Sequence, residues 1–332
     1  MMSQGAANIR VKIIAKGQDS CPWQNHLPSE DDRWGDCLFL FDREARDYDF
    51  LVVIDDVSRK IKGPAETLAC ADEHTLLVTT EPPTITRYGN AFCHQFHSVL
   101  TTHPECSLPH PNRMYSQTGN LWFNGHSCLE LQSLSFAEKP RLISTVCSSK
   151  QQRHTLHQQR LEFTEWLCGK LSELQRFGHG FKPLTNKYDA LDSFRFHLAI
   201  ENWVGKHHWT EKFSDPILSE CLPIYFGCPN MTDYFPSESF VSIDIHQREE
   251  ALDRIEELTN NPAAYQRHRP AILEAKRLIL EEYNLLRLIH DHVCRSYNPQ
   301  AKPSGRALYG RKTMRFRNPR DLFSHFRWFF TR

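Results

Sequence analysis

The residues best suited to chemistry in this chain lie close together near its middle. Glu201 and Asn202 follow an apolar run, and Thr210, Glu211 and Lys212 come shortly afterwards. Threonine is a preferred N-cap, so Glu211 and Lys212 are expected in the first turn of a helix. Free backbone N–H groups and the helix dipole favour an anion at that position. The pattern therefore predicts a phosphate-binding helix N-terminus.

The apolar run before these residues indicates what positions them. Residues 194–200 alternate and then fill with apolar side chains, which is typical of a short buried strand. Glu201 and Asn202 would then lie at the carboxyl end of that strand. Open α/β sheets bind their ligands at this edge. We therefore expect a ligand site between the strand and the helix that follows it.

The same segment resembles the donor-binding motif of the α1,3-fucosyltransferases, glycosyltransferase family 10, in its bacterial type. The matching pieces are residues 194–202, 208–212 and 223–227, and they have the order and spacing of that family. Two positions differ from the family pattern. Ile200 replaces the usual Phe, and His208 stands where the family usually has Tyr, so this position lacks a phenolic hydroxyl.

The resemblance implies a fold, a reaction and a set of donor-binding residues. The fold would be α/β with GT-B architecture, in which two facing Rossmann-like domains hold the active site in their cleft. The reaction would be the inverting transfer of L-fucose from GDP-β-L-fucose to a hydroxyl of an oligosaccharide acceptor, with an α1,3-type linkage. The donor-binding residues would be Arg153, Glu201, Asn202, His208, Thr210, Glu211 and Lys212.

Arg153 is assigned by its position after another expected strand, residues 141–148. Within that strand, residues 146–149 resemble the family's Ser-Asn-Cys strand, which precedes a helix with an arginine that contacts the donor pyrophosphate. Taken alone, an arginine among Gln and His residues would be interpreted as a solvated helix residue. Together with Lys212, Arg153 would neutralise the departing diphosphate without a metal. We therefore expect no obligatory metal cofactor.

A general base is expected from the first half of the chain. Glu81 follows the apolar run 75–79, and Pro82 holds its backbone extended, which places its carboxylate at the carboxyl edge of a sheet. The run resembles a strand of bacterial-type fucosyltransferases that ends in a Glu proposed as the catalytic base. In the alternative interpretation, Glu81 only caps a turn or pairs with Arg87. The base would then be sought among Asp55, Asp56 and Glu130.

Length and pattern predict the domain organisation. The 332 residues suit two domains of about 150 residues each. We expect an acceptor-side Rossmann-like domain over 1–138, a nucleotide-sugar donor-binding Rossmann-like domain over 139–298, and a basic and aromatic tail over 299–332. The second domain alternates strand and helix patterns, which indicates a parallel sheet. Residues 92–102 are expected to form a strand, and residues 271–293 a long helix.

Composition restricts the class of partner and the compartment. The net charge is zero, so nucleic acid is not an expected partner. The eleven cysteines are scattered without a Cys-x-x-Cys pair, which argues against a disulfide framework and a zinc ribbon and favours a reducing compartment. Cys93, His94 and His97 do not suggest zinc, because a strand would place His94 on the opposite face. No signal peptide or membrane-spanning run is visible, so a cytoplasmic location is expected.

The tail allows two interpretations. Its cations greatly outnumber Asp321, and aromatic side chains crowd its last ten residues. Such a segment either closes a core by packing on the N-terminal domain or lies peripherally on the inner face of an anionic membrane. The aromatic residues are Phe323, Phe326, Trp328, Phe329 and Phe330.

Other functions remain open from the sequence alone. A GT-B transferase could use another nucleotide sugar, and a catalytically degenerate protein could bind the nucleotide sugar without turnover. A third alternative is a membrane-peripheral scaffold in which the tail dominates. The acceptor is not identified, because its contacts would come from loops such as 31–36 and 104–124, where no specificity pattern is recognisable.

Overall fold

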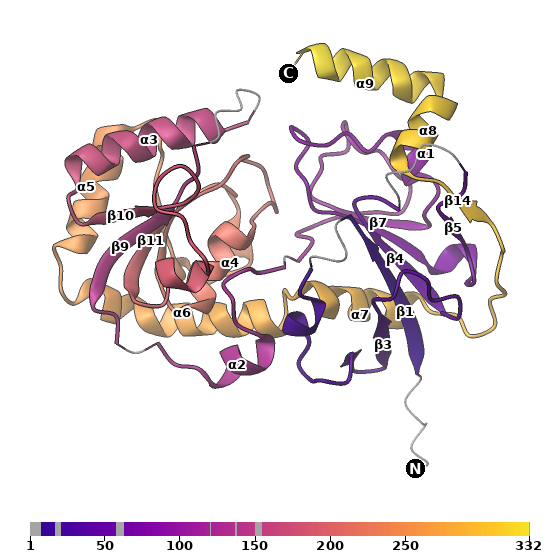
Figure 1. Cartoon of the computed structure of the whole chain (residues 1–332), viewed down its shortest axis with the longest axis horizontal. Helices are drawn as coiled ribbons and strands as arrows, with labels where there is room; N and C mark the ends of the chain where they lie inside the picture. Colours follow the sequence, from indigo (N-terminus) through magenta and orange to yellow (C-terminus); the bar gives the residue numbers. More distant parts are fainter. Residues whose placement is uncertain are drawn as a thin grey trace. The chain divides into compact units, whose positions relative to one another are not determined.

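The structure, a computed structural model, describes residues 8–16, 21–57, 63–119, 121–136, 138–149 and 155–331. The chain folds into two compact units. Unit 1 comprises Met1–Gly119 and Leu285–Arg332, and unit 2 comprises Asn120–Asn284. Unit 1 therefore combines the N-terminal part of the chain, indigo to purple in Figure 1, with the C-terminal part, orange to yellow.

Unit 1 is built on a seven-stranded sheet with the order β2-β3-β1-β4-β6-β7-β8. All neighbouring strands are parallel except β2, which pairs antiparallel with β3. The two strands β4 and β6 are completely buried, as expected for a parallel sheet covered on both faces. The strands are β1 (Ile9–Ala15), β2 (Arg33–Trp34), β3 (Cys37–Leu40), β4 (Phe50–Ile54), β6 (Thr75–Thr79), β7 (Ser98–Thr101) and β8 (Arg113–Tyr115).

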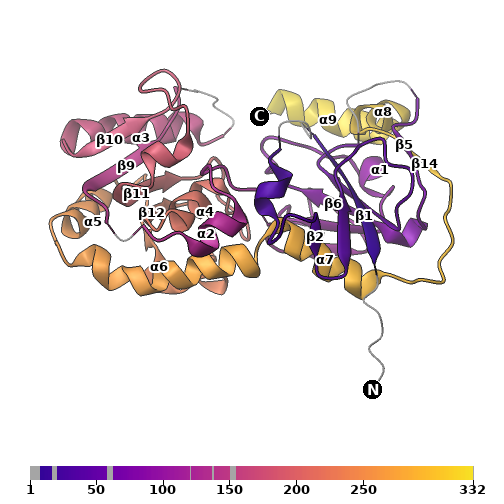
Figure 2. The same cartoon turned by 60° about the horizontal axis from the view of Figure 1, so that its bottom comes forward.

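The chain returns to unit 1 after residue 284 and contributes helices and one short strand. This strand, β14 (Ala307–Leu308), pairs antiparallel with β5 (Glu66–Thr67). The helices of unit 1 are α1 (Asn90–Cys93), α7 (Leu285–Ser296), α8 (Arg311–Arg317) and α9 (Pro319–Thr331). Figure 2 shows α8 and α9 as consecutive segments beside α1 and β14.

Unit 2 is built on a fully parallel five-stranded sheet with the order β10-β9-β11-β12-β13. Figures 1 and 2 both show α3 and α6 on opposite sides of this sheet. The strands are β9 (Arg141–Val146), β10 (Leu174–Phe177), β11 (Phe194–Ile200), β12 (Leu222–Phe226) and β13 (Val241–Ser242). The helices are α2 (Cys128–Ser133), α3 (His157–Lys170), α4 (Glu211–Leu218), α5 (Arg248–Thr259) and α6 (Ala264–Glu281).

The prediction of an α/β fold with two parallel sheets is confirmed, and two local predictions are wrong. The strand expected from residue 92 begins only at Ser98, because residues 90–93 form α1. The Asp321 carboxylate accepts hydrogen bonds from the backbone N–H groups of Asn90 and Ala91, at 3.1 and 2.8 Å, and so caps this short helix. The long helix expected over 271–293 is interrupted between α6 and α7, where the chain passes from unit 2 to unit 1.

Candidate functional site

A cavity of about 200 Å³ lies at the carboxyl edge of the unit 2 sheet. Its wall includes the ends of β9 and β11, the first turn of α3, the glycine after β10 and the first turn of α4. The charged side chains that line it are Arg160, Lys187, Glu211 and Lys212. This is the edge where sequence analysis predicted a ligand site.

The N-terminus of α4 is fixed to the end of β11 by Glu201. Thr210 is the N-cap of α4, and its hydroxyl accepts from the Lys212 backbone N–H at 3.3 Å. The Glu201 carboxylate, completely buried, accepts from the Thr210 backbone N–H at 2.8 Å and from the Thr210 hydroxyl at 2.8 Å. Burial raises the pKa of Glu201, although the charge of Lys212 and the bonds from Thr210 oppose this. Glu201 therefore positions the helix start.

Glu211 and Lys212 form an ion pair on the cavity wall. Lys212 Nζ lies 2.8 Å from Glu211 Oε1 and 3.8 Å from Glu201 Oε2. Burial alone would raise the pKa of Glu211, but the charges of Lys212 and Lys187 hold it below its ordinary value. Burial alone would lower the pKa of Lys212, but Glu211 and Glu201 raise it. Both side chains are therefore charged at neutral pH.

Arg160, which sequence analysis did not single out, is the cation with the least neutralised charge in this wall. It lies in the first turn of α3, and its Nη1 donates to Asn202 Oδ1 at 2.9 Å and to the Ile200 carbonyl at 3.4 Å. These partners are neutral, and the buried Nε has no hydrogen-bond partner within the described part of the chain. By contrast, Lys187 is paired with the buried Asp215. Arg160 is thus available to an anion.

A signal for Arg160 was present in the sequence. Phe163, Thr164 and Leu167 follow it at helical spacing, and all three are buried. An arginine on the apolar face of a helix has to meet a polar group or a ligand, because a buried charge is costly without a partner. The arginine that sequence analysis chose, Arg153, lies outside the described residues.

The two other predicted donor residues have different surroundings. Asn202 follows β11, and its side-chain oxygen orients Arg160. His208 is buried, and its ring packs edge-on against Trp203 with ring centroids 5.0 Å apart. Asn202 is thus connected to the cavity through Arg160. His208 packs instead against Trp203, a residue of the loop between β11 and α4.

His197 adds a neutral imidazole to the cavity wall. Ser144 Oγ donates to the Ala190 carbonyl at 2.6 Å, so it accepts from His197 Nδ1 at 2.8 Å. Burial, and then the charge of Lys187, lowers the pKa of His197 to about 3. The ring therefore stays neutral, with its proton on Nδ1 and an acceptor lone pair on Nε2.

Glu81, the predicted base, lies in unit 1 just after β6. Its side chain is 36 % exposed, and Oε1 lies 3.9 Å from Lys16 Nζ. Its backbone carbonyl accepts from His103 Nε2 at 2.8 Å. The Glu81 carboxylate is thus paired with Lys16 at long distance, and its side chain is partly exposed to solvent.

The alternative carboxylates all have structural partners. Asp55, at a φ of +66°, accepts from the Thr80 backbone N–H at 2.8 Å and from the Tyr88 hydroxyl. Asp56 accepts from the Arg311 backbone N–H at 2.9 Å. Glu130 completes the capping box at the start of α2. These hydrogen bonds give each of the three carboxylates a structural role, so no catalytic role is needed to account for its position.

The family match lies within unit 2. Residues 136–276 match the C-terminal part of glycosyltransferase family 10 (fucosyltransferase). The chain is 37% identical over 83 residues to an α-(1,3)-fucosyltransferase FucT of Helicobacter pylori, which covers 25% of this chain and 17% of that protein. It is 30% identical over 121 residues to α-(1,3)-fucosyltransferase B of Drosophila melanogaster, covering 36% and 26%. It is 36% identical over 84 residues to GDP-fucose protein O-fucosyltransferase 3 of Gallus gallus, covering 24% and 18%.

Solved structures give more distant matches over more of the chain. A crystal structure of an α1,3-fucosyltransferase with GDP-fucose aligns at 16% identity and a TM-score of 0.47, covering 86% of this chain and 94% of that one. An α-glucosyltransferase in complex with UDP and DNA aligns at 9% identity and a TM-score of 0.46, covering 88% and 100%. The sequence relatives are matched over about a quarter of their length or less. Residues 136–276, which match the family 10 model, contain the whole cavity wall.

Proposed function

We propose that this protein is an inverting fucosyltransferase, which transfers L-fucose from GDP-β-L-fucose to a hydroxyl of a glycan acceptor. The observation that carries the proposal is the cavity of unit 2, where Arg160 and Lys212 meet the N-terminus of α4. A buried arginine with neutral partners, next to a helix start, is suited to a diphosphate. The family 10 match over the same residues supports GDP-fucose as the donor.

In this proposal the cations act on the leaving group. The bond between the anomeric carbon and the donor's β-phosphate oxygen breaks, and its electron pair stays with GDP. Positive charge grows on the fucose ring while negative charge grows on the diphosphate. Arg160, Lys212 and, before α3, Arg153 would hold that negative charge. Each such contact stabilises the transition state by about 2 to 4 kcal/mol when water is excluded.

The remaining donor residues would bind hydroxyl groups or hold others in place. Glu211, ionised and on the cavity wall, would accept from ribose or fucose hydroxyls. Asn202 would orient Arg160, and Thr210 and Glu201 would hold the start of α4. His208 would belong to the donor site as part of the loop that precedes α4. Glu211 would thus contact the donor itself, whereas Asn202, Thr210 and Glu201 would position the groups that contact it.

Glu81 would be the general base. It would take the proton of the acceptor hydroxyl as the acceptor oxygen bonds to the anomeric carbon, which contributes about 10² to 10⁴ in rate. Its accessible carboxylate and the structural bonds of Asp55 and Asp56 support this choice. Attack opposite to the leaving group inverts the anomeric configuration. We therefore assign unit 1, with Glu81, to the acceptor side and unit 2, residues 120–284, to the donor side.

The acceptor class has two candidates. An α1,3-type linkage to a glycan is supported by the match to the α-(1,3)-fucosyltransferases of H. pylori and D. melanogaster. A hydroxyl of a protein side chain is supported by the similarity to GDP-fucose protein O-fucosyltransferase 3 of G. gallus. We favour the glycan, because the D. melanogaster match covers more of this chain.

The tail would add a peripheral membrane contact at the inner face of a bilayer, consistent with a cytoplasmic enzyme. It packs on unit 1 through Asp321, yet α9 exposes an apolar face whose Phe323 and Phe330 are 72% and 79% exposed. The two helices α8 and α9 also carry five arginines, Arg311, Arg315, Arg317, Arg320 and Arg327. Such a helix binds anionic lipid surfaces. Within the described residues, no helix has the length and apolar character needed to cross a bilayer.

Isothermal titration tests the donor assignment. GDP and GDP-fucose should bind the wild-type chain, and UDP-glucose and GDP-mannose should bind more weakly than GDP-fucose. If another nucleotide sugar binds more tightly, that compound and not GDP-fucose would be the donor. Donor binding without release of GDP in the presence of any acceptor would indicate a degenerate transferase. No nucleotide binding would contradict the proposal.

A further inference from the structure

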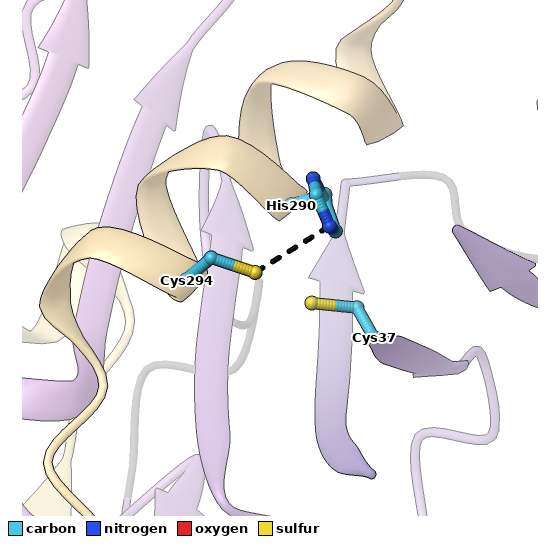
Figure 3. Close-up of side chains that lie close together, drawn as sticks. All are labelled: Cys37, His290 and Cys294. Carbon is cyan, nitrogen blue, oxygen red and sulfur yellow. Dashed lines mark hydrogen bonds between the residues drawn. The ribbon is translucent and has the colours of Figure 1, made fainter. Parts of the chain in front are cut away.

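Two cysteines and a histidine that play no part in the donor site converge inside unit 1. Cys37 begins β3, and His290 and Cys294 lie one helical turn apart on α7. Their ligand atoms, two sulfurs and one imidazole nitrogen, all lie within 4.8 Å of one another. Figure 3 shows the three side chains pointing toward one another from the strand and the helix. This is the ligand set of a thiolate-rich metal site.

The spacing fits zinc. Zn–S bonds of about 2.3 Å and Zn–N bonds of about 2.0 Å in a tetrahedron place neighbouring ligand atoms about 3.5 to 3.8 Å apart. Cys294 Sγ lies 3.4 Å from His290 Nε2, close to that separation. Cys37 Sγ is close enough to complete the set with a side-chain adjustment.

The imidazole is held in the orientation that a metal needs. His290 Nδ1 lies 2.8 Å from Asp291 Oδ1, so the Nδ1–H donates and the Nε2 lone pair faces the thiols. Asp291 is itself held by Arg287, whose Nε lies 2.9 Å from both carboxylate oxygens. A carboxylate behind the second nitrogen is the usual partner of a metal-bound histidine. The orientation is therefore provided before any metal binds.

The surroundings of the three side chains differ between one side and the other. A Cβ atom at Gly35 would lie 2.6 Å from His290 Nε2, so this turn leaves no room for a side chain beside the ring. Cys37 is buried and Cys294 is exposed, which gives the group a closed side and an open side. Binding zinc would exchange the two thiol protons for the metal and leave two thiolates and a neutral imidazole.

We propose that Cys37, His290 and Cys294 bind one zinc ion, with a water molecule in the fourth position on the exposed side. The ion would join β3 in the sheet to α7, the helix with which the chain returns to unit 1. These segments are far apart in sequence, so the bond would stabilise unit 1 against unfolding. The site is separate from the donor cavity of unit 2 and does not depend on the proposed transfer reaction.

Elemental analysis of the purified full-length chain tests this. After incubation with zinc and removal of unbound metal, the wild type should retain one zinc per chain. Cys294→Ser and Cys37→Ser should each weaken zinc binding by a factor of about 100 or more, in competition with a chromophoric chelator. Cys106→Ser, which changes another exposed cysteine of unit 1, is the matched control and should retain zinc. Because Cys294 is exposed, its variant should fold, and circular dichroism checks this.

Two further measurements separate a metal site from a chance cluster. Asp291→Asn should weaken zinc binding by about 10- to 100-fold, since it acts only through His290. Cobalt should give the intense visible absorption of a tetrahedral thiolate site, and this absorption should disappear in Cys294→Ser. A wild-type chain with reduced thiols and no bound zinc would overturn the proposal. So would undiminished zinc in Cys294→Ser, or a Cys37–Cys294 disulfide in the purified protein.

Discussion

The two units use the carboxyl edges of their sheets differently. In unit 2, the groups after β11 form one connected set, in which Glu201 holds Thr210 and Asn202 holds Arg160, beside one cavity. In unit 1, Asp55 and Asp56 lie after β4 at an equivalent edge, but their bonds go to Thr80, Tyr88 and Arg311. A carboxylate at a strand end is therefore informative only together with its partners.

Glu81, the partly exposed carboxylate at the unit 1 edge, provides the strongest test of this difference between the two units. Glu81→Gln should lower turnover by a factor of about 10² to 10⁴, because the amide cannot take the acceptor proton. GDP-fucose affinity should change little, since a base acts only in the transition state. Steady-state kinetics and titration measure the two effects. Glu44→Gln, which changes another exposed carboxylate of unit 1, is the control. A fully active Glu81→Gln enzyme would direct the search to Asp55, Asp56 or Glu130.

The cations of unit 2 should give the next largest effect. Arg160→Met and Lys212→Met should each weaken GDP binding and lower kcat/KM by about 10²- to 10³-fold, because the diphosphate loses a charge-assisted contact. Arg153→Ala should also weaken GDP binding. Lys170→Met, at the exposed end of α3, is the matched control. Unchanged GDP affinity in both Met variants would show that the diphosphate does not bind in this cavity.

Two threonines at the sheet edges allow a direct contrast between the units. Thr210→Ala and Thr80→Ala each remove a hydroxyl that bonds a buried carboxylate, so each should lower the free energy of unfolding by about 1 to 3 kcal/mol. Only Thr210→Ala should also weaken GDP binding, since it loosens the start of α4. Urea unfolding and titration provide both values. Equal losses of GDP affinity would show that the contrast is wrong.

Buried histidines in both units should make stability depend on pH. Burial lowers the pKa of His197 to about 3 and that of His103 to about 4, from 6.5. The unfolded chain takes up these protons as the pH falls below 6.5, whereas the folded chain does not. Each residue should therefore remove up to about 1.4 kcal/mol of stability per pH unit below 6.5. His197→Gln should reduce this slope in urea unfolding, and an unchanged slope would contradict the assignment.

The smallest effect is expected from divalent ions in the assay. If arginine and lysine neutralise the diphosphate, omitting or adding Mg²⁺ or Mn²⁺ should change turnover by less than about twofold. Initial rates at saturating donor measure this. An absolute requirement for either ion would argue against the roles given to Arg160 and Lys212. The zinc proposal for unit 1 is tested separately by metal content and cobalt absorption.

The parts of the fold that were predictable from the sequence rest on local signals. The apolar runs predicted β6, β9 and β11, and the capping preference of threonine predicted the start of α4. The spacing of the motif identified the edge of the sheet where the cavity lies. These features depend on residues that are neighbours in the chain.

The missed features depend on residues that are distant in the chain. Helix α1 is capped by Asp321, more than two hundred residues away, so no local pattern distinguished it from a strand. Arg160 was overlooked although the spacing of Phe163 and Leu167 places it on the apolar face of α3, because only the fold shows that this face is buried. The group of Cys37, His290 and Cys294 has no Cys-x-x-Cys spacing, because it forms only when the chain returns to unit 1.

The most direct test of the account is the product of one reaction. The wild-type enzyme is incubated with GDP-β-L-fucose and a lactosamine-type acceptor, and the products are analysed by mass spectrometry and by NMR of the anomeric proton. We predict one fucose added per acceptor, an equal amount of GDP, and an α-linked product, because inversion converts the β-linked donor. A β-linked product would contradict the inverting mechanism. Binding of GDP-fucose without transfer to any glycan or protein acceptor would contradict the proposed function itself.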